Sequence, residues 1–119
     1  MIITVPISVG ELLDKISILQ IKSQFTDSLC VIKEKNYLIE IAKENKVFNE
    51  DFLNQLLEVN SKLWKLEDNL REYEKKNLFG DEFIKDARLV YITNDKRAKI
   101  KKMINHLTNS ELHETKIYK

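Results

Sequence analysis

A chain of 119 residues is long enough for one folded domain and too short for two domains of ordinary size. Hydrophobic residues make up 43% and charged residues 33%, with only two glycines and one proline, which argues against a disordered or loop-rich protein and favours a helical one. The 20 basic and 19 acidic residues leave a formal net charge of +1, so the molecule as a whole has no electrostatic attraction for duplex nucleic acid or an anionic membrane.

Cysteine content and hydropathy indicate in which cellular compartment the protein is expected. The chain has a single cysteine, Cys30, which cannot form an intramolecular disulfide, and a domain of this size without one fits a reducing compartment. The N-terminal segment lacks the positive start and cleavage site of a secretory signal, and no apolar run approaches the roughly 20 residues that span a bilayer. We therefore expect a cytoplasmic protein without a membrane partner, with Cys30 in the core rather than acting as a nucleophile.

The first predicted elements are an extended arm over residues 1–8 and a helix over residues 9–24. Pro6 interrupts the β-branched residues of the arm, so they cannot form a regular internal strand. Ser8 and Glu11 have the spacing of a capping box, in which their side chains accept hydrogen bonds from free amides at a helix start. Apolar residues cover more than one side of the helix that follows, which predicts that it lies at the centre of the fold.

Three further helices are predicted from apolar spacing and capping residues, over residues 28–45, 50–76 and 82–107. Before the last of them, Gly80 can take a positive φ and Asp81 can cap the helix. The tail over residues 110–119 is expected to be extended. Together these elements predict one all-α domain, an antiparallel bundle of about four helices with short extended terminal segments.

Polar side chains interrupt the apolar faces of the two longest predicted helices. The buried face of the earlier helix continues into Glu67 and Arg71, and that of the later helix continues into Asn94 and Lys101. The short turn at Gly80 makes these helices antiparallel, which brings their polar stretches to similar heights. Burying an unpaired amide or charge costs several kcal/mol, so these groups must be paired, hydrated or bound to a ligand.

Two interpretations of this polar region remain open. In the first, buried ion pairs and amides form a structural network that fixes how the helices pack. In the second, lysines and arginines converge on a pocket for a phosphate or carboxylate ligand, beside which Trp64 or Tyr91 offers a flat face for a ring. The candidate ligand-binding residues are Lys15, Lys22, Asn60, Trp64, Glu67, Arg71, Tyr91, Asn94, Arg97 and Lys101.

Other kinds of site have little support from residue spacing. Cys30, His106 and His113 lack the spacing of a metal site, and the chain has no glycine-rich phosphate loop or nucleophile elbow. We therefore expect no metal and no cofactor. The basic run over residues 96–102 has lysines spaced as a solvated helix face and follows Asp95, which argues against binding to duplex nucleic acid.

The motif-bearing segments of the chain are SVGELLDKISILQIKS, NSKLWKLEDNLREYE, FIKDARLVYITNDKRAKIKKMIN and NSELHETKIYK. Together they resemble a family of small bacterial and phage-borne proteins of unknown function, over nearly the whole chain. The motif positions of that family correspond here to Glu11, Asp14, Lys15, Trp64, Glu67, Asp68, Arg71, Tyr91, Asn94, Asp95, Arg97, Glu114, Lys116 and Tyr118. The resemblance implies no activity, but it implies that the tail folds back so that Lys116 and Tyr118 join the polar end.

The leading functional hypothesis is a non-catalytic binding protein for a small anionic ligand, such as a nucleotide or nucleotide-sugar. It would act as a phage-type sequestering protein or as an accessory to surface-sugar synthesis. One alternative is an enzyme that acts on a small anionic metabolite by electrostatic stabilisation. Another is a helical module for homo-oligomerisation, in which the polar residues set the register. A homo-oligomer is also compatible with the leading hypothesis and is expected.

Overall fold

The computed structural model describes residues 1–112, which form four α-helices joined by short turns. The helices are α1 Val9–Ser23, α2 Leu29–Glu44, α3 Glu50–Lys75 and α4 Asp81–Leu107. No strand occurs in this part of the chain, so the predicted all-α antiparallel bundle is confirmed, and each predicted helix end lies within one residue of the observed end. None of these helices combines the length and apolar character that a membrane span requires. The predicted positions of Lys116 and Tyr118 lie outside the described residues.

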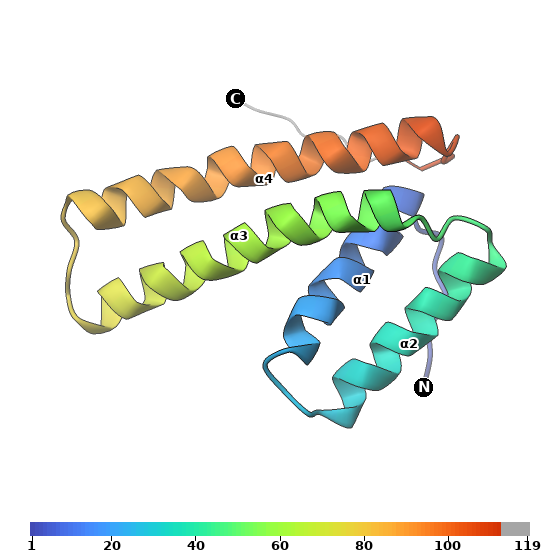
Figure 1. Ribbon diagram of the computed structural model, residues 1–119, viewed down its shortest axis with the longest axis horizontal. Helices are drawn as coiled ribbons and strands as arrows, with labels where there is room; N and C mark the ends of the chain where they lie inside the picture. Colours follow the sequence, from blue (N-terminus) through green and yellow to red (C-terminus); the bar gives the residue numbers. More distant parts are fainter. Residues whose placement is uncertain (113–119) are drawn as a thin grey trace.

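The helices form two antiparallel hairpins that cross each other (Figure 1). The long pair, α3 and α4, lies along the longest axis of the molecule, and the shorter pair packs obliquely against the half farthest from the α3–α4 turn. α1 contacts α2, α3 and α4, so the prediction that the helix beginning at Val9 is central is confirmed. α2 packs along α1 at the edge of the molecule.

The core lies where α1 crosses the long hairpin. Leu13 and Ile16 of α1 are fully buried there, together with Leu56 of α3 and Ile104 of α4. Ala42 joins this cluster from α2. Each large aliphatic side chain buried in this way contributes about 1.5–3 kcal/mol. Hydrophobic burial at the crossing therefore holds the two hairpins together.

The half of the long hairpin near its turn has contacts of its own. The ring of Phe83 makes edge contacts with Tyr73 and Phe79, at centroid distances of 6.4 and 5.3 Å. Asn69 Nδ2 donates a hydrogen bond to Asp86 Oδ2 at 3.3 Å. These contacts pair α3 with α4 beyond the region that α1 covers, so the hairpin extends past the core as a unit.

The turn between α3 and α4 differs from the prediction. Asn77 takes the left-handed conformation with φ 54°, whereas Gly80 has φ −84° and is itself the N-cap of α4, so that Asp81 is the first helical residue. Leu78 N–H donates to the carbonyl of Tyr73 at 2.9 Å, which closes the end of α3. A positive φ is thus needed where α3 ends, and asparagine tolerates it there.

The prediction that Cys30 lies in the core is wrong, because this side chain is exposed. Among the four helices of residues 1–112, α2 has one neighbour, α1, and within α2 only Ala42 is fully covered. Cys30 lies in the first turn of α2, where its side chain is exposed. The apolar residues beside it in the sequence therefore do not indicate burial.

Gly10 lies where α1 and α4 come closest. A Cβ added at Gly10 would lie 2.7 Å from the backbone oxygen of Lys101 and 2.9 Å from Oδ1 of Asn105. Both distances are shorter than van der Waals contact. The two helices can approach each other in this way only because residue 10 has no side chain.

We predict that Gly10→Ala lowers the free energy of unfolding by about 1–3 kcal/mol, because the backbone of α4 would have to move. Gly80→Ala is the matched control, since a Cβ at Gly80 would meet no atom within 4 Å. It should change the free energy of unfolding by less than about 1 kcal/mol. Urea unfolding followed by circular dichroism measures both changes. Equal losses in the two variants would contradict the prediction.

Candidate functional site

Polar side chains of α4 form a seam with the first turns of α1. Asn105 Oδ1 accepts a hydrogen bond from the Gly10 N–H at 2.7 Å, which satisfies an amide at the N-terminus of α1. One turn earlier on α4, Lys101 Nζ lies 2.7 Å from Glu11 Oε2. Lys101 is only 7% exposed, so its charge is compensated inside the protein rather than by solvent. These side chains attach the start of α1 to the end of α4.

Asp14 continues the seam along α1 and is fully buried, with 0% exposure. Its Oδ1 accepts hydrogen bonds from Arg97 Nε and Asn60 Nδ2, both at 2.9 Å, and its Oδ2 pairs with Arg97 Nη2. Asn60 Nδ2 also donates to Ser17 Oγ at 2.7 Å, and Ser17 Oγ donates to the backbone oxygen of Asp14 at 2.7 Å. One carboxylate of α1 is therefore held by side chains of α3 and α4.

We predict that Asp14→Ala lowers the free energy of unfolding by about 3–5 kcal/mol, because it removes one partner of a buried ion pair. Adding Arg97→Ala should cost less than the sum of the two single changes, since the unpaired charge then disappears as well. A double-mutant cycle in urea measures this coupling.

The exposed pair Asp68 and Arg71, with Oδ1 and Nη1 3.7 Å apart, is the control for this cycle. Its coupling should stay below about 1 kcal/mol, because solvent screens both charges. Strictly additive effects of the Asp14 and Arg97 changes would show that the buried pair does not join the helices energetically.

A pocket of about 440 Å³ opens between α1, α3 and α4, directly beside the Asp14 network. Its volume falls within the range of small-molecule sites, about 300–1,000 Å³. Asn60 and Arg97 belong to both the network and the pocket lining. One wall of the pocket is therefore fixed by buried hydrogen bonds. The apolar part of the lining comes from Ile18, Ile21 and Leu63.

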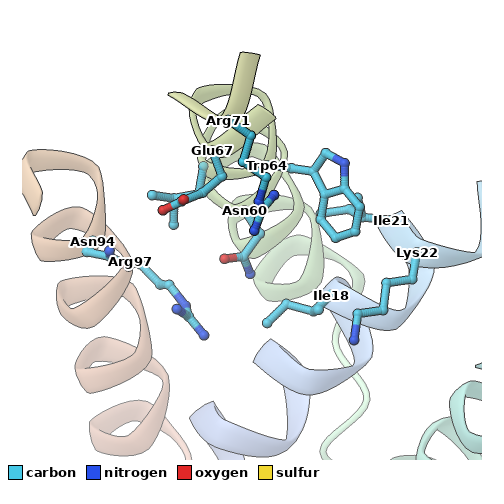
Figure 2. Close-up of a pocket in the computed structure, with 10 residues that line it drawn as sticks. Ile18, Ile21, Lys22, Asn60, Trp64, Glu67, Arg71, Asn94 and Arg97 are labelled. Atoms are coloured by element: carbon cyan, nitrogen blue, oxygen red, sulfur yellow. The ribbon is translucent and has the colours of Figure 1, made fainter. Parts of the chain in front are cut away.

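Basic side chains reach this pocket from three helices (Figure 2). Lys22 approaches from α1, Arg71 from α3 and Arg97 from α4. The Glu67 carboxylate is turned toward α4, where Asn94 lies, whereas the ring of Trp64, one turn earlier on the same helix, is turned toward α1. The pocket therefore has an acidic and amide side at α4 and an aromatic side at α1.

One face of Trp64 is already occupied. Its ring stacks on Phe25, with centroids 5.3 Å apart and an angle of 6° between the planes. Phe25 follows the end of α1 and, together with Trp64, lines a smaller hollow of about 260 Å³. A ligand ring in the main pocket could therefore stack only on the opposite face of Trp64.

Most of the predicted ligand-binding residues line the main pocket, namely Lys22, Asn60, Trp64, Glu67, Arg71, Asn94 and Arg97. Lys15 and Tyr91 do not, and both are exposed elsewhere, Tyr91 to 56%. Lys101 lies in the seam with Glu11. Because α1 crosses the long hairpin obliquely, only its second half borders the pocket, and this excludes Lys15.

Asp14 and Ser17 are the polar groups that helical-face reasoning missed. Both are fully buried and hold Asn60 against α1. The sequence feature that could have identified Asp14 is its position between Leu13 and Ile16, inside the apolar stretch of a central helix. An acidic residue in such a position requires a partner. The family resemblance did include Asp14.

In residues 1–112, no group of three or more His, Cys, Asp or Glu side chains is placed to hold a metal ion. The polar groups of the pocket are instead basic and amide side chains with one carboxylate. Arginine, lysine and amide nitrogens are donors, so this lining can bind anionic and hydroxyl-bearing groups directly.

Comparison with protein families adds one match. A model described as "Family of unknown function (DUF6165)" matches residues 3–119, which is nearly the whole chain. No curated protein and no solved structure matches the chain.

Proposed function

The chain belongs to the DUF6165 family, whose function is unknown, and we propose that it is a non-catalytic binding protein for a small phosphorylated ligand. The ligand would lie in the pocket between α1, α3 and α4. The observation that carries this proposal is the approach of Lys22, Arg71 and Arg97 to one pocket from three different helices. Cations that converge on partly desolvated space favour an anionic group such as phosphate.

The basic side chains of the pocket differ in how far their charge is already compensated. Arg97 donates hydrogen bonds from Nε and Nη2 to the buried carboxylate of Asp14. Arg71 has a weaker partner, because its Nη1 lies 3.7 Å from Asp68 Oδ1 and both side chains are exposed. Lys22 is exposed at the end of α1. We therefore expect Lys22 and Arg71 to bind the phosphate, while Arg97 shapes the wall.

The remaining lining fits a ligand that also carries a ring. Both N–H groups of the Asn60 side chain are used by Asp14 and Ser17, which leaves its Oδ1 to accept a hydrogen bond. Asn94 is exposed and can both donate and accept. Trp64 and the side chain of Ile18 offer apolar area in the lining. A nucleotide or nucleotide-sugar combines phosphate, hydrogen-bonding edges and flat rings in this way.

A binding protein with this site would hold a metabolite without changing it. Such a role suits a protein that sequesters the ligand or delivers it to an enzyme. We place this role in the cytoplasm, where a single cysteine such as Cys30 stays reduced.

We predict that ADP, UDP or inorganic pyrophosphate changes the fluorescence of Trp64, the only tryptophan of the chain. Lys22→Ala should weaken binding of these probes about 5- to 20-fold, because one charge-assisted hydrogen bond is lost. Lys15→Ala is the matched control, since it removes an exposed lysine from the same helix outside the pocket. Its effect should stay below about twofold.

Isothermal titration calorimetry checks the same affinities without relying on Trp64. Absence of binding for every phosphorylated probe would contradict the proposed function. Equal weakening by Lys22→Ala and Lys15→Ala would mean that the probes are held by general surface charge rather than by the pocket.

A second candidate function is self-association. It is supported by the arm over residues 1–8, where the side chains of Met1, Ile2, Ile3 and Val5 are all at least 64% exposed. Exposed apolar residues that adjoin one another in this way are common at protein interfaces. We predict a homo-oligomer that becomes monomeric when residues 2–5 are deleted, measured by light scattering over a range of concentrations. A monomer at every concentration would remove this candidate.

A further inference from the structure

Glu67 is an unexpected lining group in a pocket for an anion. Its side chain is half-buried between α3 and α4, and its carboxylate turns into the pocket (Figure 2). Arg71, the basic residue one turn further along α3, pairs with Asp68 instead. Among residues 1–112, no ion pair forms with Glu67. A half-buried carboxylate with this position needs hydrogen-bond donors from elsewhere.

The ligand itself can supply those donors. An ionised carboxylate only accepts hydrogen bonds, and its two oxygens can take both hydroxyl hydrogens of a vicinal diol. A second phosphate at this place would be repelled by Glu67. An ammonium group would be attracted by Glu67 but opposed by the positive charges of Arg71 and Arg97, which line the same pocket. Neutral hydroxyl groups are therefore the chemistry that suits Glu67 inside a basic pocket.

The arrangement of the lining leaves room for both parts of such a ligand. Lys22 reaches the pocket from α1, whereas Glu67 and Asn94 lie on the side of α4 (Figure 2). Trp64 is turned to the α1 side, one turn from Glu67 on α3. A phosphate held by Lys22 on the α1 side can thus lie apart from a diol at Glu67, with the amide of Asn94 next to the hydroxyl groups.

We propose that Glu67 is a specificity-determining residue that binds the hydroxyl groups of a sugar, so that the ligand is a phosphorylated compound with a vicinal diol. Ribonucleotides and sugar phosphates share this chemistry. This inference rests on the proposed function, because it concerns the same pocket. It goes further in excluding phosphate alone and deoxy analogues as the preferred ligand.

The test compares four probes by calorimetry on the full chain: ADP, 2′,3′-dideoxyadenosine diphosphate, ribose 5-phosphate and inorganic pyrophosphate. The protein should bind ADP about tenfold more tightly than the dideoxy analogue, because Glu67 loses its donors in the analogue. In Glu67→Gln this ratio should fall below about twofold, while affinity for pyrophosphate is unchanged or higher. Ribose 5-phosphate shows whether the diol and phosphate suffice without a base.

Glu74→Gln is the control, since Glu74 is an exposed glutamate two turns further along α3 and does not line the pocket. It should leave the ratio of ADP to dideoxy affinity at its original value. Circular dichroism and thermal melting establish that both variants fold as the parent does.

Equal affinity of the unaltered protein for ADP and its dideoxy analogue would overturn the inference and leave the proposed function standing. A preference for ADP that survives Glu67→Gln would overturn the role of Glu67. Failure of every probe to bind, pyrophosphate included, would overturn the proposed function together with the inference.

Discussion

The buried carboxylate of Asp14 is the constraint on which the arrangement of this protein depends. A charge without solvent contact is tolerated only with a partner and with hydrogen bonds to its oxygens. Arg97 and Asn60 meet this need, and they come from α4 and α3. One side chain of α1 therefore fixes the positions of two other helices. The hydrophobic contacts of Leu13 and Ile16 supply cohesion at the crossing, but they do not select one register as strictly as a charge does.

Some polar residues of α4 make contacts that hold the fold together, and others line the pocket. Arg97, Lys101 and Asn105 bond to α1 and close the seam, whereas Asn94, one turn further toward the α3–α4 turn, lies at the pocket. The structural network that one interpretation expected thus lies on the later turns of this helix, and the earlier turn at Asn94 borders the pocket. Arg97 belongs to both, since its guanidinium neutralises Asp14 and also lines the pocket. A wall fixed in this way is pre-organised, so its side chains would lose little conformational entropy if a ligand bound.

Local features of the fold could be predicted because their causes are local. Ser8 caps α1 as its spacing to Glu11 indicates, and the apolar coverage of the helix beginning at Val9 identified it as central. Predictions failed where local signals compete or depend on a neighbour. Asn77 took the left-handed position that Gly80 was expected to take, because the positive φ closes α3. Cys30 is exposed because, within residues 1–112, no other helix covers that side of α2.

The sequence by itself determined the helices, their antiparallel order and a polar region shared by the later two, since periodicity and capping act within a few residues. Only the tertiary structure decided which polar residues meet. Lys15 and Lys22 share a helix, yet of these two only Lys22 reaches the pocket, and Lys101 pairs with Glu11. The physical reason is that the angle and height at which α1 crosses the long hairpin depend on packing at Gly10 and on the partners of Asp14, which involve residues far apart in the chain.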